Sequence, residues 1–244
     1  MKKTLKELIK IKHNLDDKTI DSIVMQGKII VNGEKVFLSS LKFPEDSKIK
    51  IINYEKEYVS RGAYKLKEAI TKFNIKVDNK VCLDIGSSTG GFVQVLLENN
   101  ASKVYAVDSG TNQLDYSLRI KDNVFVYEKT NLKNLTENMF DENIDLITCD
   151  VSFISLKHVF EICNKIFNNN CQLVALIKPQ FEASSKYVQP GGFVDKQHHK
   201  FIIDRVIEHA KKNDFVLVNE IVESPILGEK SKNIEYLSHF EKRS

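Results

Sequence analysis

The chain has 244 residues, of which 42% are hydrophobic, and a formal net charge of +3 at pH 7. This length allows one large domain and one small domain, and this hydrophobic content excludes a disordered chain. The first residues alternate lysines with apolar residues, unlike a signal peptide, and no apolar run is long enough for a membrane span, so we expect a cytoplasmic protein.

The first 55 residues predict a small α+β domain. Apolar residues at helical spacing indicate two short helices, and Asn32-Gly33 between apolar runs is typical of a hairpin turn. A charged stretch follows, so we expect a domain of residues 1–55, a linker of residues 56–60 and a second domain of residues 61–244. The predicted elements are helices at 5–11 and 20–24 and strands at 29–31, 35–38 and 49–52.

From Ser60 to the C-terminus, helical patterns alternate with apolar strands, which predicts a doubly wound, mostly parallel sheet. Ligands of such a sheet collect at the carboxyl ends of its strands. The predicted strands are 80–85, 103–107, 124–127, 144–149, 171–177, 215–222 and 234–240. The predicted helices are 60–73 and, approximately, 90–99, 111–119, 155–167 and 196–213.

Charge and cysteine content add two further expectations. Residues 1–58 carry the whole surplus of +3, which is compatible with attraction to phosphate and equally with an ordinary solvated lysine face. The cysteines have no C-x-x-C pairing, so we expect reduced packing residues. They are Cys82, Cys149, Cys163 and Cys171.

Residues 81–92, VCLDIGSSTGGF, predict a buried strand that breaks into a glycine-rich turn and opens a helix. Asp84 precedes the turn, and Asp108 ends the next strand, where a carboxylate can accept hydrogen bonds from a ribose diol. The spacing lacks the Gly-x-Gly-x-x-Gly pattern of a pyrophosphate cradle, and an acid before the turn suits the ammonium of an amino-acid-bearing cofactor. S-adenosylmethionine is therefore the predicted ligand, and an ordinary strand-to-helix turn is the alternative.

Two polar residues follow buried strands directly. Asp150 ends one strand and Lys178 ends another, while the helix that begins at Ser60 carries Lys65. A lysine at a strand end can simply extend to solvent. Methylation of a ribose hydroxyl needs a base, however, and a lysine can serve only where burial or a nearby cation favours its neutral form. In this reading Lys178 is the base, Lys65 is the neighbouring cation and Asp150 orients the base.

This chemistry requires no metal. His198 and His199 lack partners at ligand spacing, so we expect both side chains at the surface.

Six motifs in chain order carry a resemblance to a known family. They are Ser60-Arg-Gly-Ala-Tyr-Lys-Leu66, Asp84-Ile-Gly-Ser-Ser-Thr-Gly-Gly-Phe92, Tyr105-Ala-Val-Asp-Ser-Gly110 with Gln113-Leu114, Asp150-Val-Ser-Phe-Ile-Ser155, Lys178-Pro-Gln-Phe-Glu182 and Asn233-Ile-Glu-Tyr-Leu237. Together they resemble the TlyA, or hemolysin A, family, which joins an RNA-binding domain of the ribosomal-protein-S-four type to an FtsJ-like methyltransferase domain.

The resemblance implies a fold and an activity. The fold is a small N-terminal α+β RNA-binding domain and a Rossmann-like, seven-stranded class I methyltransferase sheet. The activity is S-adenosylmethionine-dependent 2'-O-methylation of a cytidine in ribosomal RNA, within an assembled or partly assembled ribosomal subunit, by a monomer.

The family's site residues match positions of this chain. The resemblance implies a catalytic tetrad of Lys65, Asp150, Lys178 and Glu235, with Glu223 as the rival for the fourth place. It also implies a cofactor site of Asp84, Gly86, Ser87, Ser88, Thr89, Gly90, Gly91, Phe92, Asp108, Asn131 and Asp150.

The N-terminal domain departs from the family, since lysines stand where the family has arginines, and lysine does not bind phosphate bidentately. Two other function classes remain alternatives. One is a membrane-active hemolysin, and the other is a ribosomal RNA-binding protein with no catalytic activity.

Overall fold

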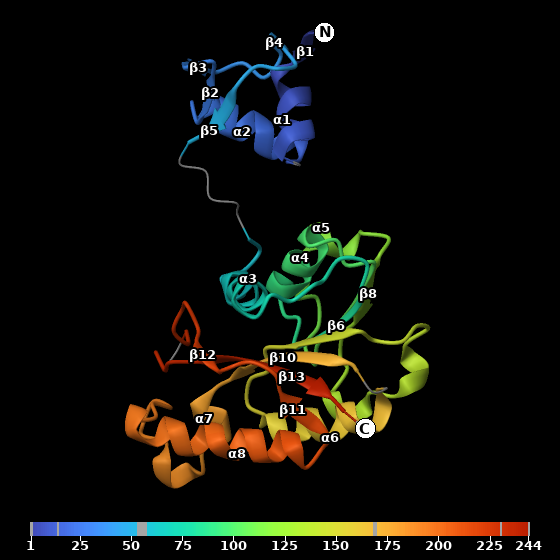
Figure 1. Ribbon diagram of the computed structural model, residues 1–244, viewed down its shortest axis with the longest axis vertical. Helices are drawn as coiled ribbons and strands as arrows, with labels where there is room; N and C mark the ends of the chain where they lie inside the picture. The colour runs from blue at the N-terminus through green and yellow to red at the C-terminus, as the bar shows by residue number, and fades with distance from the viewer. Residues whose placement is uncertain (1, 14, 53–57, 168–169, 230, 244) are drawn as a thin grey trace. The chain divides into compact units, whose positions relative to one another are not determined.

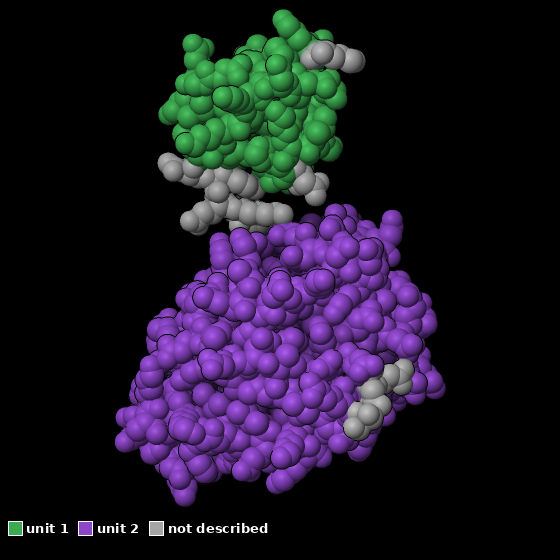
Figure 2. Space-filling view, viewed as in Figure 1, with its two compact units in different colours: residues 1–57 green, residues 58–244 purple. Residues whose placement is uncertain are grey.

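The computed structural model describes residues 2–13, 15–52, 58–167, 170–229 and 231–243. They form two compact units, residues 1–57 and residues 58–244 (Figure 2). Of the predicted linker, residues 56 and 57 lie outside the described residues, and residues 58–60 belong to the second unit.

The first unit packs two helices against a three-stranded antiparallel sheet. Its second helix begins where the Asp16 carboxylate accepts a hydrogen bond from the Thr19 N–H group, and Asn32 and Gly33 turn the hairpin with positive φ angles. Both predicted helices and all three predicted strands occur, whereas the short β1–β4 pair was not predicted. The elements are β1 (Lys2–Thr4), α1 (Leu5–His13), α2 (Asp17–Met25), β2 (Ile29–Val31), β3 (Glu34–Val36), β4 (Lys42–Pro44) and β5 (Ile49–Ile51).

The second unit is built on one large sheet with the strand order β11-β13-β10-β9-β6-β7-β8 (Figure 1). The five strands from β10 to β8 are parallel, and β13 runs antiparallel between β10 and β11. These seven strands confirm the predicted Rossmann-like sheet, and the two-residue β12 pairs with β13 as an eighth. The strands are β6 (Val81–Ile85), β7 (Lys103–Val107), β8 (Val124–Tyr127), β9 (Leu146–Cys149), β10 (Gln172–Ile177), β11 (Phe215–Leu217), β12 (Val222–Glu223) and β13 (Tyr236–Lys242).

Helices cover both faces of this sheet (Figure 1). Because side chains alternate along a strand, Leu173 and Ala175 pack in the core beneath α6 and α8, while Val174 packs in the core beneath α3 and α4. The helices are α3 (Gly62–Phe73), α4 (Gly91–Glu98), α5 (Tyr116–Arg119), α6 (Leu156–Ile166), α7 (Pro179–Glu182) and α8 (His199–Lys211). Short 3₁₀ turns lie at Leu132–Asn134, Glu137–Met139, Ser185–Tyr187 and Lys196–His198.

Three predicted elements differ in extent. The predicted helix 111–119 is only α5, because the Asp115 carboxylate accepts a hydrogen bond from the Ser117 N–H group and starts the helix there. The predicted strand 215–222 is divided between β11 and β12. Two more residues separate Leu217 from Val222 than separate their partners on β13, so the chain bulges between them. The last strand extends to Lys242, two residues beyond the prediction.

The prediction of a surface position is wrong for His199. This side chain is buried, with Nδ1 2.7 Å from the Tyr236 hydroxyl and Nε2 3.0 Å from the Val194 carbonyl oxygen. Its place at the first turn of α8 faces the end of β13, and two polar partners offset the cost of its burial. His198 is partly exposed.

All four cysteines are buried free thiols, as their place in apolar patterns predicts. Among the helices of the described chain, none has both the length and the apolar character needed to cross a membrane.

Candidate active site

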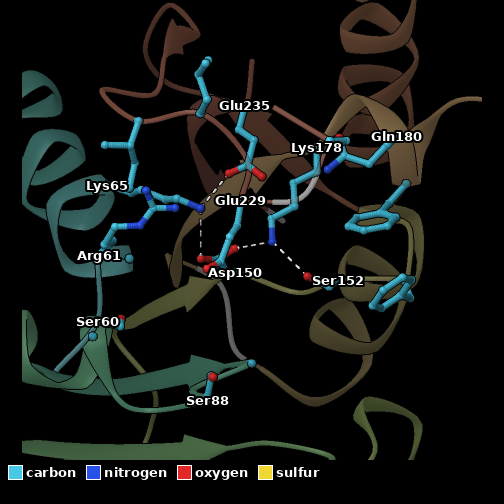
Figure 3. Close-up of a pocket in the computed structure, with 18 of the residues that line it drawn as sticks. Ser60, Arg61, Lys65, Ser88, Asp150, Ser152, Lys178, Gln180, Glu229 and Glu235 are labelled. Atoms are coloured by element: carbon cyan, nitrogen blue, oxygen red, sulfur yellow. Dashed lines mark hydrogen bonds and ion pairs between the residues drawn. The ribbon is translucent and has the colours of Figure 1, made fainter. Parts of the chain in front are cut away.

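A pocket of about 920 Å³ opens at the carboxyl ends of β6, β9 and β10. Six chain segments wall it: the start of α3, the glycine-rich turn before α4, the loop after β9, the loop after β10, a hairpin-like segment around Gly191, and the segment that leads into β13 (Figure 3). The site therefore lies where a doubly wound sheet places its ligands.

Two glycines give the turn its shape. Gly86 has a φ of +84°, and a Cβ atom on it would lie 3.0 Å from the Asp150 backbone oxygen. A Cβ atom on Gly91 would lie 2.2 Å from the Ser60 hydroxyl oxygen, so this glycine lets α4 approach the start of α3. Seven predicted cofactor residues line the pocket, namely Gly86, Ser87, Ser88, Thr89, Gly91, Phe92 and Asp150.

Asp84 lies beneath the turn instead of at the pocket wall. Its side chain is 1% exposed, and its Oδ1 atom accepts a 2.7 Å hydrogen bond from the Thr148 hydroxyl. The other oxygen is buried and has no hydrogen-bond partner among the described residues. Burial raises the pKa of Asp84 to about 7. Sequence reasoning placed this carboxylate against a ligand, whereas the structure surrounds it with protein.

The remaining predicted cofactor residues lie outside the pocket lining. The Asp108 carboxylate accepts hydrogen bonds from the backbone N–H groups of Ser88 (2.9 Å) and Gly110 (2.7 Å) and so ties the second strand end to the turn. Asn131 is exposed and caps a 3₁₀ turn by accepting a hydrogen bond from the Lys133 N–H group. Gly90 packs against Leu114 and Leu118, behind the turn.

The four predicted catalytic residues form one cluster in the pocket (Figure 3). Lys65 Nζ lies 2.6 Å from Glu235 Oε2 and 3.6 Å from Asp150 Oδ2. Lys178 Nζ lies 2.6 Å from Asp150 Oδ1. Helix α3, the ends of β9 and β10, and the residue before β13 thus bring together four side chains that are up to 170 positions apart in the sequence.

The two lysines have different surroundings. Burial lowers the pKa of Lys65, but the carboxylates of Asp150 and Glu235 outweigh this effect, so the pKa lies above its ordinary value. Lys65 is therefore a stable ammonium. Lys178 contacts one carboxylate and donates a 3.1 Å hydrogen bond to the Ser152 hydroxyl.

The structure distinguishes between the two glutamates considered for the fourth place. Glu235 is 3% exposed and contacts Lys65. Glu223 forms an exposed ion pair with Lys196 at 2.8 Å. Only Glu235 lies in the cluster.

The sequence analysis did not predict the aromatic side chains at the mouth of the pocket. Phe153 is 82% exposed, and its ring centroid lies 5.0 Å from that of Phe181. Both residues line the pocket, as do Ser152, Arg61 and Glu229. The sequence did contain a signal for these side chains, because the loops after β9 and β10 each carry a phenylalanine.

The residues of the pocket indicate which kinds of ligand it can hold. In the described part of the chain, no cluster of three or more histidine, cysteine, aspartate or glutamate side chains could hold a metal ion. The glycine-rich turn lets a ligand approach its backbone closely, and the pocket is large enough for a nucleoside.

Comparison with known proteins finds relatives that agree with the resemblance in the motifs. Hemolysin A of Brachyspira hyodysenteriae is 43% identical over 89% of this chain and 90% of its own length. The 16S/23S rRNA (cytidine-2'-O)-methyltransferase TlyA of Mycobacterium tuberculosis is 36% identical over 88% of this chain and 80% of its own. A solved structure of a hemolysin candidate from Streptococcus thermophilus is 35% identical, covers 100% of this chain and 89% of that chain, and has a TM-score of 0.75.

More distant structures share only the fold. The N-methyltransferase NodS of Bradyrhizobium japonicum, solved with S-adenosyl-L-homocysteine, has a TM-score of 0.51 at 12% identity and covers 74% of this chain and 88% of that chain. The model of the FtsJ-like methyltransferase family matches residues 58–242. The resemblance found in the motifs is confirmed: this chain belongs to the FtsJ-like methyltransferases and, within them, to the TlyA and hemolysin A relatives.

Proposed function

We propose that this protein transfers a methyl group from S-adenosylmethionine to the ribose 2'-hydroxyl of a cytidine in ribosomal RNA. The observation that carries the proposal is the cluster of Lys65, Asp150, Lys178 and Glu235 in a pocket beside a glycine-rich turn. The names of two TlyA relatives, from Mycobacterium tuberculosis and Campylobacter jejuni, support the substrate.

The cofactor supplies an electrophilic methyl group on a sulfonium sulfur. Bound S-adenosylmethionine would supply the methyl group to the 2'-oxygen, and the amine of Lys178 would accept the hydroxyl proton. Asp150 and Ser152 hold that amine in place. S-adenosylhomocysteine and the methylated ribose leave, and Lys178 returns its proton to solvent.

Lys178 suits the role of base better than Lys65. Lys65 contacts two carboxylates, which favour its protonated form, whereas Lys178 contacts one. The ammonium of Lys65 contacts the same carboxylate as Lys178 and so holds Asp150 beside the base. Glu235 holds Lys65 at 2.6 Å and keeps that charge in place.

The pocket mouth suits a nucleotide that has left its stack. A ribose hydroxyl within an RNA helix cannot enter the pocket and reach the buried amine of Lys178. Extruded nucleobases stack on aromatic side chains. Phe153 offers an exposed ring at the edge of the cavity that holds Lys178.

The first unit is proposed to bind RNA, as the S-four-type domain of the family does. The lysine surplus of residues 1–58 is consistent with this role. An assembled or partly assembled subunit as substrate, a monomeric state and a cytoplasmic location stay predictions.

The proposal is tested by incubating unmodified ribosomal subunits with tritiated S-adenosylmethionine and mapping the labelled nucleotide. The wild-type protein should label one or both subunits. Lys178→Ala should bind the cofactor and lose at least about 100-fold in transfer rate, since general-base catalysis is worth that much. Cofactor binding without any label would refute the proposed function, and unchanged transfer by Lys178→Ala would remove Lys178 as the base.

A further inference from the structure

Two loops bring the central residues of the cluster together. Residues 150–155 follow β9, and residues 178–182 follow β10. Lys178 is the N-cap of α7, whose Phe181 N–H group donates a 2.9 Å hydrogen bond to the Lys178 carbonyl oxygen. Glu182, the last residue of this single-turn helix, is therefore fixed relative to Lys178.

Glu182 joins the two loops through a buried carboxylate. Its side chain is 4% exposed, and its two oxygens accept hydrogen bonds from the Ser155 hydroxyl (2.7 Å) and from the Leu156 N–H group (2.8 Å). Ser155 is the N-cap of α6, where the helix dipole favours a negative charge. Burial raises the pKa of Glu182 above its ordinary value, and these two hydrogen bonds offset part of that effect.

The loop held by this joint carries residues of the pocket. Phe153 has a φ of +64°, a left-handed conformation that a bulky residue adopts only where its surroundings impose it. The neighbouring Ser152 accepts a hydrogen bond from Lys178. The centroid of the Phe153 ring lies 5.0 Å from that of Phe181. Lys178 and Phe181 thus make the contacts between the loops at the pocket, and Glu182 adds a buried contact outside the pocket lining.

We propose that Glu182 is a positioning residue, which fixes Phe153 and Ser152 relative to Lys178 and so aligns the ribose hydroxyl with the base. The inference rests on the proposed function. It predicts an effect on the methyl-transfer step without an effect on cofactor binding, because Glu182 faces the α6 N-terminus and does not line the pocket.

The test measures single-turnover methyl transfer to ribosomal subunits at saturating protein, together with the Kd of S-adenosylmethionine. Glu182→Ala should slow transfer at least about 10-fold, because small misplacements of reacting groups cost that much or more. The Kd of the cofactor should stay within about twofold of the wild type if the pocket wall is unchanged. Glu182→Gln keeps an oxygen for the Leu156 N–H group and an amide for Ser155, so its rate should return to within about threefold of the wild type.

Two further variants serve as comparisons. Ser155→Ala removes one of the two contacts together with the N-cap of α6, so its rate is measured per folded molecule and should be intermediate. Glu161→Ala removes a partly exposed carboxylate from the same helix and should leave the rate unchanged.

The inference is overturned if Glu182→Ala transfers methyl at the wild-type rate per folded molecule, or if Glu182→Gln is as slow as Glu182→Ala. A wild-type protein that binds cofactor but labels no RNA would instead refute the proposed function, so the two failures are distinguishable.

Discussion

Two lysine amines and two carboxylates share one pocket, and their arrangement gives the lysines different surroundings. Lys65 lies between Asp150 and Glu235, and Lys178 lies on the other side of Asp150. Asp150 thus contacts both amines. Removal of either lysine leaves a buried carboxylate with less compensation, which affects the remaining amine as well.

Lys65 should be essential without being the base. Lys65→Ala should lower the rate of methyl transfer at least about 100-fold, because Asp150 loses one of its two lysine partners and no longer holds the base in alignment. Lys67→Ala is the matched control, two positions along α3 with an exposed side chain, and should keep the wild-type rate. Single-turnover kinetics with both variants check this. A Lys65→Ala protein with wild-type kinetics would contradict this role of Lys65.

Asp84 should make the stability of the second unit depend on pH. Its pKa of about 7 lies above the ordinary value, so between about pH 4 and pH 7 the folded protein binds more protons than the unfolded chain. The contribution of Asp84 to the free energy of unfolding therefore falls as the pH rises through this range and is constant above it.

Asp84→Asn removes that titration and keeps an oxygen for the Thr148 hydroxyl. The free energy of unfolding of this variant, relative to the wild type, should rise between pH 4 and pH 7 by as much as about 4 kcal/mol. Denaturant unfolding at several pH values measures the difference. Asp122→Asn changes an exposed carboxylate and should give a flat difference; a flat difference for Asp84→Asn would show that its carboxylate is ionised in the folded protein.

At the residue scale, the sequence predicted which side chains meet in the cluster better than how each is buried. The motifs identified Lys65, Asp150, Lys178 and Glu235, and the structure brings all four together. The burial of Asp84 depends on Thr148, a residue of another strand 64 positions away, and local pattern carries no such information.

The approach of α3 and α4 depends on one glycine. A Cβ atom on Gly91 would lie 2.9 Å from the Ala63 backbone nitrogen as well as 2.2 Å from the Ser60 hydroxyl oxygen. Gly91→Ala should therefore destabilise the protein by about 1–3 kcal/mol, as overpacking typically does. Thermal or denaturant unfolding measures this change.

A second variant separates the two contacts. Gly91→Ala combined with Ser60→Ala removes the hydroxyl and leaves the backbone contact, so it should recover only part of the lost stability. Full stability in Gly91→Ala alone would mean that the helices separate without cost.

At the scale of elements, periodicity predicted the order of strands and helices, and tertiary pairing decided their extents. The segment 215–222 is apolar enough for one strand, but its pairing with β13 includes two extra residues and divides it. The predicted helix from residue 111 failed because Asp115 caps α5 four residues later. Both outcomes depend on contacts that a single segment does not encode.

The whole molecule consists of two units with separate cores. The cluster of Lys65, Asp150, Lys178 and Glu235 lies within residues 58–244, so deletion of residues 1–57 should leave the Kd of S-adenosylmethionine within about twofold of the wild type. The same deletion should weaken RNA binding at least about 10-fold, because phosphate contacts are lost. Isothermal titration with the cofactor and filter binding with ribosomal RNA check both expectations. The slope of RNA affinity against salt should also decrease.

An unchanged RNA affinity after this deletion would contradict an RNA-binding role for the first unit. The family's arginines are absent from that unit, so its lysines would have to supply the contacts.

The identity of the methylated atom tests the central claim most directly. RNA labelled by the wild-type protein is digested to nucleosides and analysed by mass spectrometry. A lysine base beside an extruded ribose predicts 2'-O-methylcytidine, absent when Lys178→Ala replaces the wild type. Methyl groups found on a base nitrogen or carbon, with the ribose unmodified, would contradict the account.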